Sequence, residues 1–204
     1  MVKNRLPREK LLQAIDFSQR LTDTKLWIRM ADELIAAANI LEIEVEKYWS
    51  EIQLDGHNQP VSTSNRKYVQ GAFSLLIAYA LENYFKALLI HRNQKDLKGW
   101  LLTKLRSTKL PKCFFKHDLG RLAFELKLKL DTSEEELLYR LSRSSIWAAR
   151  YPVPIEPEAL ANMKKFSSGK SYFIAYYAPQ DIKRIHNFID RLRNHVLAET
   201  ENDS

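Results

Sequence analysis

The chain has 204 residues, of which 45% are apolar and 28% are charged. This length and composition suit one folded domain with an added N-terminal element and argue against a disordered chain. The single cysteine, Cys113, excludes an internal disulfide, and no Cys or His spacing typical of a zinc site is present. We therefore predict no metal and no other cofactor. The basic N-terminus lacks the apolar segment of a secretory signal, so we expect a cytoplasmic protein.

The net charge of +7 is placed unevenly along the chain. Residues 91–130 hold 11 Lys and Arg against 3 Asp and Glu, whereas acidic and basic residues nearly balance on either side of this segment. Such a local excess could attract phosphates or an acidic partner, or it could be a solvated connector. The candidate nucleic-acid contacts are Lys98, Lys104, Lys109, Lys112, Lys116 and, on the last helix, Lys183 and Arg184.

Two helices are expected in the first quarter of the chain. A short one covers residues 8–20, and a second begins near Thr22 and Asp23 and runs to about residue 52. Apolar residues recur along the second helix at intervals of three and four, as one buried helix face requires. They are Leu26, Met30, Leu34, Ala37, Ala38, Leu41 and Val45. Residues 54–65 have the composition of a loop.

The next helix, about residues 66–91, is apolar nearly all round and should lie in the middle of a bundle. Glu82 and Lys86 interrupt it, so we expect a core helix and no membrane span. These two residues stand four apart with Glu first, which is the favourable order for an ion pair on one helix face. A structural pair is the preferred interpretation, with catalysis as the alternative.

Two further helix starts follow the basic segment. His117 or Asp118 opens a helix in "HDLGRLAFEL", where Asp accepts hydrogen bonds from free first-turn amides. In "DTSEEE", Thr132 and Glu135 fit a capping box. That helix should end near Arg150, because Pro152 disfavours helix in the residue before it.

The last helix should start near Pro179, a residue suited to the first turn. Its predicted buried stripe is Ile182, Ile185, Phe188, Ile189, Leu192 and Val196. Residues 151–178 before it look irregular and are expected to wrap over the bundle.

Taken in order, these helices resemble the HEPN domains (higher eukaryotes and prokaryotes nucleotide-binding). An amphipathic helix precedes an apolar one that contains "LENYFKALLI". "HDL" opens the third helix, "ARYP" closes the fourth, and the final helix carries "RN". The match covers about residues 26–197. It implies an all-α antiparallel helical bundle of HEPN type that dimerises through its long helices.

Many catalytic HEPN members are metal-independent ribonucleases with an Arg, a polar residue and a His further along the last helix. In such a site histidine moves the proton of a ribose 2′-hydroxyl and arginine stabilises the phosphate charge. Arg193 and Asn194 match the first half of this signature, but no histidine follows at the required spacing. Arg191 and His195 lie one helical turn apart and offer a shifted pair. The catalytic candidates are thus Arg191, Arg193, Asn194 and His195.

Polar residues at the helix ends have a simpler interpretation. We expect His117 to hydrogen-bond at a helix start, with a ligand role as the alternative, and Asp118 to cap that helix. Arg150 should bond free carbonyls at a helix end rather than clamp a phosphate.

The sequence therefore predicts an N-terminal extension (residues 1–24), a HEPN-like bundle (25–198) and a disordered tail (199–204). The expected function is a noncatalytic or weakly catalytic module that binds RNA, a nucleotide or a protein partner, such as an antitoxin or a nucleotidyltransferase, as a homodimer. A ribonuclease of toxin or defence type and a purely structural dimerisation module are the alternatives.

Overall fold

The computed structural model describes residues 8–54, 69–97, 116–148, 164–165, 171–172 and 179–201. Within these ranges the chain is a bundle of helices, which confirms the predicted all-helical class. The helices are α1 (Arg8–Thr22), α2 (Thr24–Leu54), α3 (Val69–Arg92), α5 (Leu119–Glu125), α6 (Thr132–Arg143) and α8 (Pro179–Glu201). A five-residue π-helical turn, η3 (Ser144–Ala148), continues α6.

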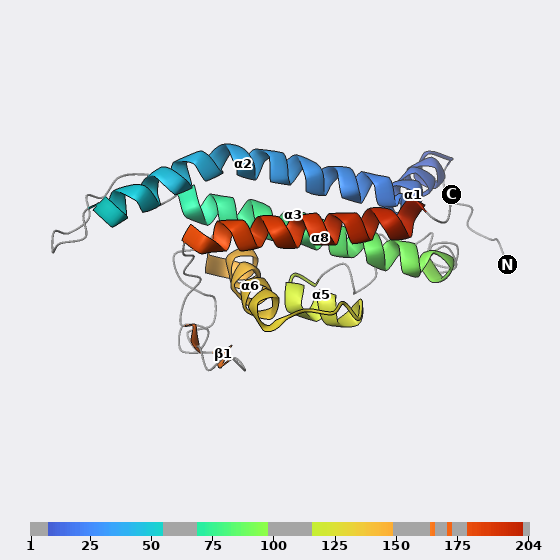
Figure 1. Cartoon of the computed structure of the whole chain (residues 1–204). Helices are drawn as coiled ribbons and strands as arrows, with labels where there is room; N and C mark the ends of the chain where they lie inside the picture. The colour runs from blue at the N-terminus through green and yellow to red at the C-terminus, as the bar shows by residue number, and fades with distance from the viewer. Residues whose placement is uncertain are drawn as a thin grey trace.

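Three long helices form the upper part of the bundle in Figure 1. α2 lies along the top, α3 and α8 lie beneath it, and α5 and α6 lie below those two. Contacts between residues far apart in the sequence give the chain directions: Glu42 meets His186, and Asp32 meets Arg193. α2 therefore runs opposite to α8. The C-terminal ends of α3 and α8 meet through Arg92 and Glu199, so these two helices run in the same direction.

α3 is the core of the fold. It contacts α2, α5, α6, η3 and α8, and 13 of its 24 residues are buried. By length and composition alone α3 could cross a membrane, but 72% of its most apolar stretch is buried inside the bundle. The burial of each large apolar side chain contributes about 1.5–3 kcal/mol relative to exposure, so this helix supplies much of the stability.

Helix starts were predicted more accurately than the buried face of α2. Asp23, between α1 and α2, accepts a hydrogen bond from the Lys25 amide at 3.0 Å and so caps the start of α2. The predicted α2 stripe was wrong in part, because Met30 is 49% exposed and Ala37 is exposed. The α2 residues buried against α3 and α8 are Ile28, Ala31, Ala38 and Val45.

The capping box of α6 lies one residue earlier than the sequence predicted. Asp131, not Thr132, is the N-cap residue, and its side chain accepts from the Glu134 amide while Glu134 accepts from the Asp131 amide. An aspartate accepts this hydrogen bond as well as a threonine does, so the pattern alone did not distinguish the two registers.

The last two corrections concern the second half of the chain. α8 starts at Pro179 as predicted and buries the expected stripe except Ile182, which is partly buried. The helix continues to Glu201, so residues 199–201 belong to it and not to a tail. In the segment predicted to be irregular, β1 (Lys164–Lys165) and β2 (Ser171–Tyr172) form a short antiparallel ladder in which Lys164 pairs with Tyr172.

Candidate functional site

Arg193 on α8 is held against α2. Its Nε donates to Asp32 Oδ1 at 2.9 Å and its Nη2 to Asp32 Oδ2 at 3.2 Å. The hydroxyl of Tyr84 on α3 donates to the same carboxylate. Arg193, which was predicted as a catalytic candidate, therefore links α8 to α2 and α3 through Asp32. Its partners differ from those of His195.

Electrostatics favours this arrangement of Asp32, Tyr84 and Arg193. Partial burial would raise the pKa of Asp32, but hydrogen bonds from Arg193 and Tyr84 together with the Arg193 charge hold this pKa below its usual value. Burial and the hydrogen bond to Asp32 raise the pKa of Tyr84. At neutral pH the three groups are thus a carboxylate, a neutral phenol and a guanidinium.

Arg191 points in a different direction, towards α6. Its Nε and Nη2 donate to Glu134 Oε1 at 3.0 and 2.6 Å, and its Nη1 lies 3.5 Å from the Lys129 carbonyl oxygen. Its guanidinium carbon stands 5.2 Å from the centre of the Phe188 ring. Since Glu134 also belongs to the capping box of α6, Arg191 is placed by the same residue that starts that helix.

His195 lies one turn beyond Arg191, beside the end of α3. Its Nε2 is 3.0 Å from Glu199 Oε1 and 3.5 Å from Arg92 Nη2. Arg92 donates to both oxygens of Glu199, at 2.9 and 2.5 Å, and its Nη1 donates to the Leu126 carbonyl at 2.5 Å. The hydrogen bonds between Arg92 and Glu199 lower the pKa of the carboxyl and raise that of the guanidinium.

The turn after α5 closes the space above these residues. The Leu128 amide donates to the Ala123 carbonyl at 3.0 Å, and the Lys127 amide to the Phe124 carbonyl at 2.9 Å. This pair of bonds is the Schellman motif, in which the residue after the C-cap takes the left-handed conformation. Lys127 occupies that position with φ of 53°.

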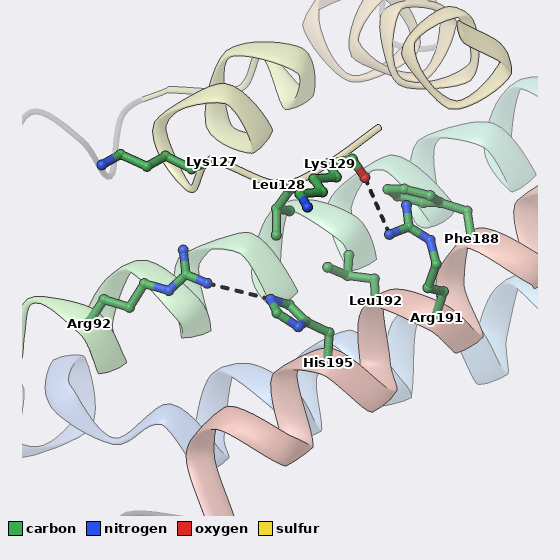
Figure 2. A pocket seen from close by; sticks show the side chains of 8 residues that line it. All are labelled: Arg92, Lys127, Leu128, Lys129, Phe188, Arg191, Leu192 and His195. Carbon is green, nitrogen blue, oxygen red and sulfur yellow. Dashed lines mark hydrogen bonds between the residues drawn. The ribbon is translucent and has the colours of Figure 1, made fainter. Parts of the chain in front are cut away.

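These elements line an open pocket with a volume of about 350 Å³. Figure 2 shows it between the turn after α5, the end of α3 and the exposed side of α8. We call it the α8 pocket. Its lining residues are Arg92, Lys127, Leu128, Lys129, Phe188, Arg191, Leu192 and His195.

The α8 pocket carries more positive than negative charge. The guanidinium of Arg92 is paired with Glu199, and that of Arg191 with Glu134. Lys127 and Lys129 have no acidic partner among the residues that the structure describes. Two lysines whose ammonium groups have no acidic partner in the described ranges thus line a pocket that Phe188 and Leu192 also line.

A second polar cluster joins α3 to the start of α5. Lys86 Nζ donates to Glu82 Oε1 at 2.5 Å, and both side chains are 8% exposed. His117 Nδ1 lies 3.0 and 3.1 Å from the two oxygens of Glu82. Lys86 also stands 6.0 Å from the Trp27 ring centre. The predicted structural pair is therefore present and buried, and His117 binds α3 rather than backbone at its own helix start.

Asp118 caps α5 as predicted, because its side chain accepts from the Arg121 amide at 2.9 Å. A buried pair that was not predicted lies nearby in the fold: Arg140 on α6 donates to Asp181 on α8 at 2.6 and 2.9 Å, and both side chains are 3% exposed. These residues are 41 positions apart, and nothing in their spacing indicates a pair.

The predicted nucleic-acid contacts have three outcomes. Lys116 is paired with Glu125, and Arg184 lies 3.4 Å from Asp181. Lys183 is exposed on α8, and Lys98, Lys104, Lys109 and Lys112 lie outside the described residues. Asn194, a predicted catalytic candidate, is also exposed on α8, and Arg150, predicted to bond carbonyls at a helix end, lies outside the described residues.

Three charged pocket residues were not among the predicted site residues: Arg92, Lys127 and Lys129. All three belong to the basic segment 91–130, whose excess charge was the only sequence signal for them. In the described ranges no group of three or more His, Cys, Asp or Glu side chains is placed to hold a metal ion. Comparisons with models of known protein families, with curated proteins and with solved structures found no match for this chain.

Proposed function

We propose that the chain is a HEPN-like helical module that binds RNA through the α8 pocket. One observation carries this proposal: residues of the basic segment and of the last helix line the same pocket, and two of its lysines have no acidic partner in the described structure. Phosphate groups are the anions that RNA offers along its whole length, and lysine and arginine are their usual partners.

The geometry of the pocket supports a binding role for its parts. Arg92 and Arg191 are held in fixed positions by Glu199 and Glu134, so they keep the turn after α5 and the side of α8 in place. Lys127 and Lys129 are exposed and can reach a ligand.

The resemblance to HEPN domains supports the same proposal at the level of the fold. The helix that contains "LENYFKALLI" is central in the bundle, which is compatible with the proposed HEPN-like arrangement. The binding face would then lie on the last helix, where that family carries its "RN" residues.

A fluorescently labelled single-stranded RNA tests the binding function. We expect binding at low salt and a steep loss of affinity at moderate salt, because Lys and Arg contacts to phosphates release condensed counterions. Fluorescence anisotropy measures both. If the full chain shows no binding at low salt, RNA is not its ligand and an acidic protein partner becomes the better hypothesis.

A ribonuclease is the second candidate, and one observation favours it: Arg191 and His195 line the same pocket. His195 would move the proton of a 2′-hydroxyl while Arg191 stabilises the phosphate. Arg193 has no part in this chemistry, since it is bound to Asp32.

Cleavage of a labelled RNA by wild type and two histidine variants separates the roles. His195→Ala should abolish cleavage and leave the melting temperature nearly unchanged. His117→Ala should lower the melting temperature, because it removes a partner of the buried Glu82, and should leave cleavage by the folded protein intact. Cleavage that survives His195→Ala would place the chemistry elsewhere.

A further inference from the structure

Lys127 occupies a backbone position that suits glycine better than lysine. Its φ of 53° lies in the left-handed region, and it is the one such residue besides glycine within the described ranges. A Cβ atom is unfavourable there, which is why glycine usually follows the C-cap in a Schellman motif. An unfavourable backbone conformation at the edge of a pocket motivates the hypothesis that the side chain has a function.

The charge of the α8 pocket indicates what the lysine binds. Its two arginines are paired with Glu199 and Glu134, so Lys127 and Lys129 supply two positive charges that no described acidic residue balances. A phosphate monoester carries a charge of about −1.5 to −2 near neutral pH, whereas a backbone phosphodiester carries about −1. The monoester is therefore the better match for the pocket.

The size of the pocket agrees with an end group. A volume of about 350 Å³ is in the lower part of the range for small-molecule pockets. It can hold one phosphate with part of its nucleoside. A phosphodiester inside a strand would have to continue in both directions, whereas a terminal phosphate needs only one way out.

We propose that the α8 pocket binds the terminal phosphate monoester of an RNA strand, with Lys127 and Lys129 as the groups that neutralise it. This inference rests on the proposed RNA-binding function. Lys127 lies at the rim and extends away from the other lining side chains (Figure 2), so its ammonium would reach the ligand only after rotation about the side-chain bonds. Arg191 and Arg92 are positioning residues that hold the walls of the pocket.

The test compares one short single-stranded RNA in three forms: with a 5′-phosphate, with a 3′-phosphate, and with hydroxyl groups at both ends. One phosphorylated form should bind the full chain about tenfold more tightly than the hydroxyl form, measured by isothermal titration calorimetry. Lys127→Gly should remove most of this preference and should not lower the melting temperature, since glycine is favoured at φ of 53°. Lys129→Ala should remove most of it as well.

Two controls test whether the charge of Lys127 and its place in the pocket cause the preference. Lys127→Arg keeps the charge and should keep the preference. Lys25→Ala removes one exposed lysine of α2, outside the pocket, and should leave the preference unchanged.

The outcomes distinguish this inference from the proposed function. Equal affinity for all three RNA forms would overturn the terminal-phosphate inference and leave RNA binding in place, and no binding of any form would overturn the proposed function itself. A preference that survives both lysine substitutions would put the phosphate elsewhere and overturn the assignment to this pocket. If adenosine monophosphate alone binds as tightly as the phosphorylated RNA, the ligand is a mononucleotide and the RNA-end assignment is wrong.

Discussion

The interior of the bundle and the α8 pocket differ in how their charged side chains are paired. In the interior, Lys86 is paired with Glu82, and Arg140 with Asp181. In the α8 pocket, two arginines are paired but Lys127 and Lys129 have no acidic partner among the described residues. Paired charges fix the helices relative to one another. Lys127 and Lys129 make no ion pair with another described residue, and this difference is why we assign the ligand to the pocket.

The largest expected effect tests the interior half of this comparison. Glu82→Ala leaves the Lys86 ammonium buried without its carboxylate, so we expect a loss of about 3–5 kcal/mol in the free energy of unfolding. Urea denaturation measures it. Glu44→Ala is the matched control, because it breaks an exposed pair with Lys47 and should lose less than about 1 kcal/mol. A loss below about 1 kcal/mol for Glu82→Ala would show that the Lys86 ammonium remains well solvated without its partner.

A smaller effect is expected where the interior meets α8. Asp32→Asn weakens the charged hydrogen bonds that Arg193 and Tyr84 make, and should lower the free energy of unfolding by about 1–2 kcal/mol at neutral pH. The folded-state pKa of Asp32 lies below its usual value of 3.8, so its contribution is present above that pH and is lost as the pH falls through the folded-state pKa. Urea melts of both proteins should therefore converge in acid. A difference that persists there would mean that the Asp32 charge is not responsible.

The smallest effect has the opposite sign and belongs to the pocket. Lys127→Gly relieves the left-handed conformation and should raise the free energy of unfolding by about 1 kcal/mol, after allowance for the greater freedom of glycine in the unfolded chain. Urea denaturation again measures it. Lys129→Gly, whose backbone is not left-handed, should give no gain. Destabilisation by Lys127→Gly would show that the lysine contributes to folding after all.

Local sequence patterns predicted the helices well because their causes are local. Pro179 and Asp118 mark helix starts through their own backbone and side-chain chemistry, and the buried stripe of α8 follows from its periodicity. The pairing of Glu82 with Lys86 was predictable for the same reason, since the two residues share one helix face.

Features that depend on packing between helices could not be predicted in this way. Arg193 meets Asp32 across 161 positions of sequence, and Met30 is exposed although its spacing fits the buried face. Neither is specified by nearby residues. Lys127 gave no sign of its left-handed backbone, because that conformation follows from how the turn meets Leu128 and the end of α5. The candidate site was therefore visible in the sequence only as an excess of charge.

The salt dependence of RNA binding tests the central claim most directly. For single strands, the logarithm of the binding constant falls with the logarithm of the salt concentration with a slope of about −0.7 per phosphate contact. The double variant Lys127→Gly/Lys129→Ala should bind more weakly, and its slope should be shallower than that of the wild type by about 0.7, because both lysines neutralise the same phosphate. The charge-matched double variant Lys25→Ala/Lys47→Ala, on α2, should keep the wild-type slope. Equal slopes for the wild type and the pocket variant would contradict the assignment of phosphate binding to the α8 pocket.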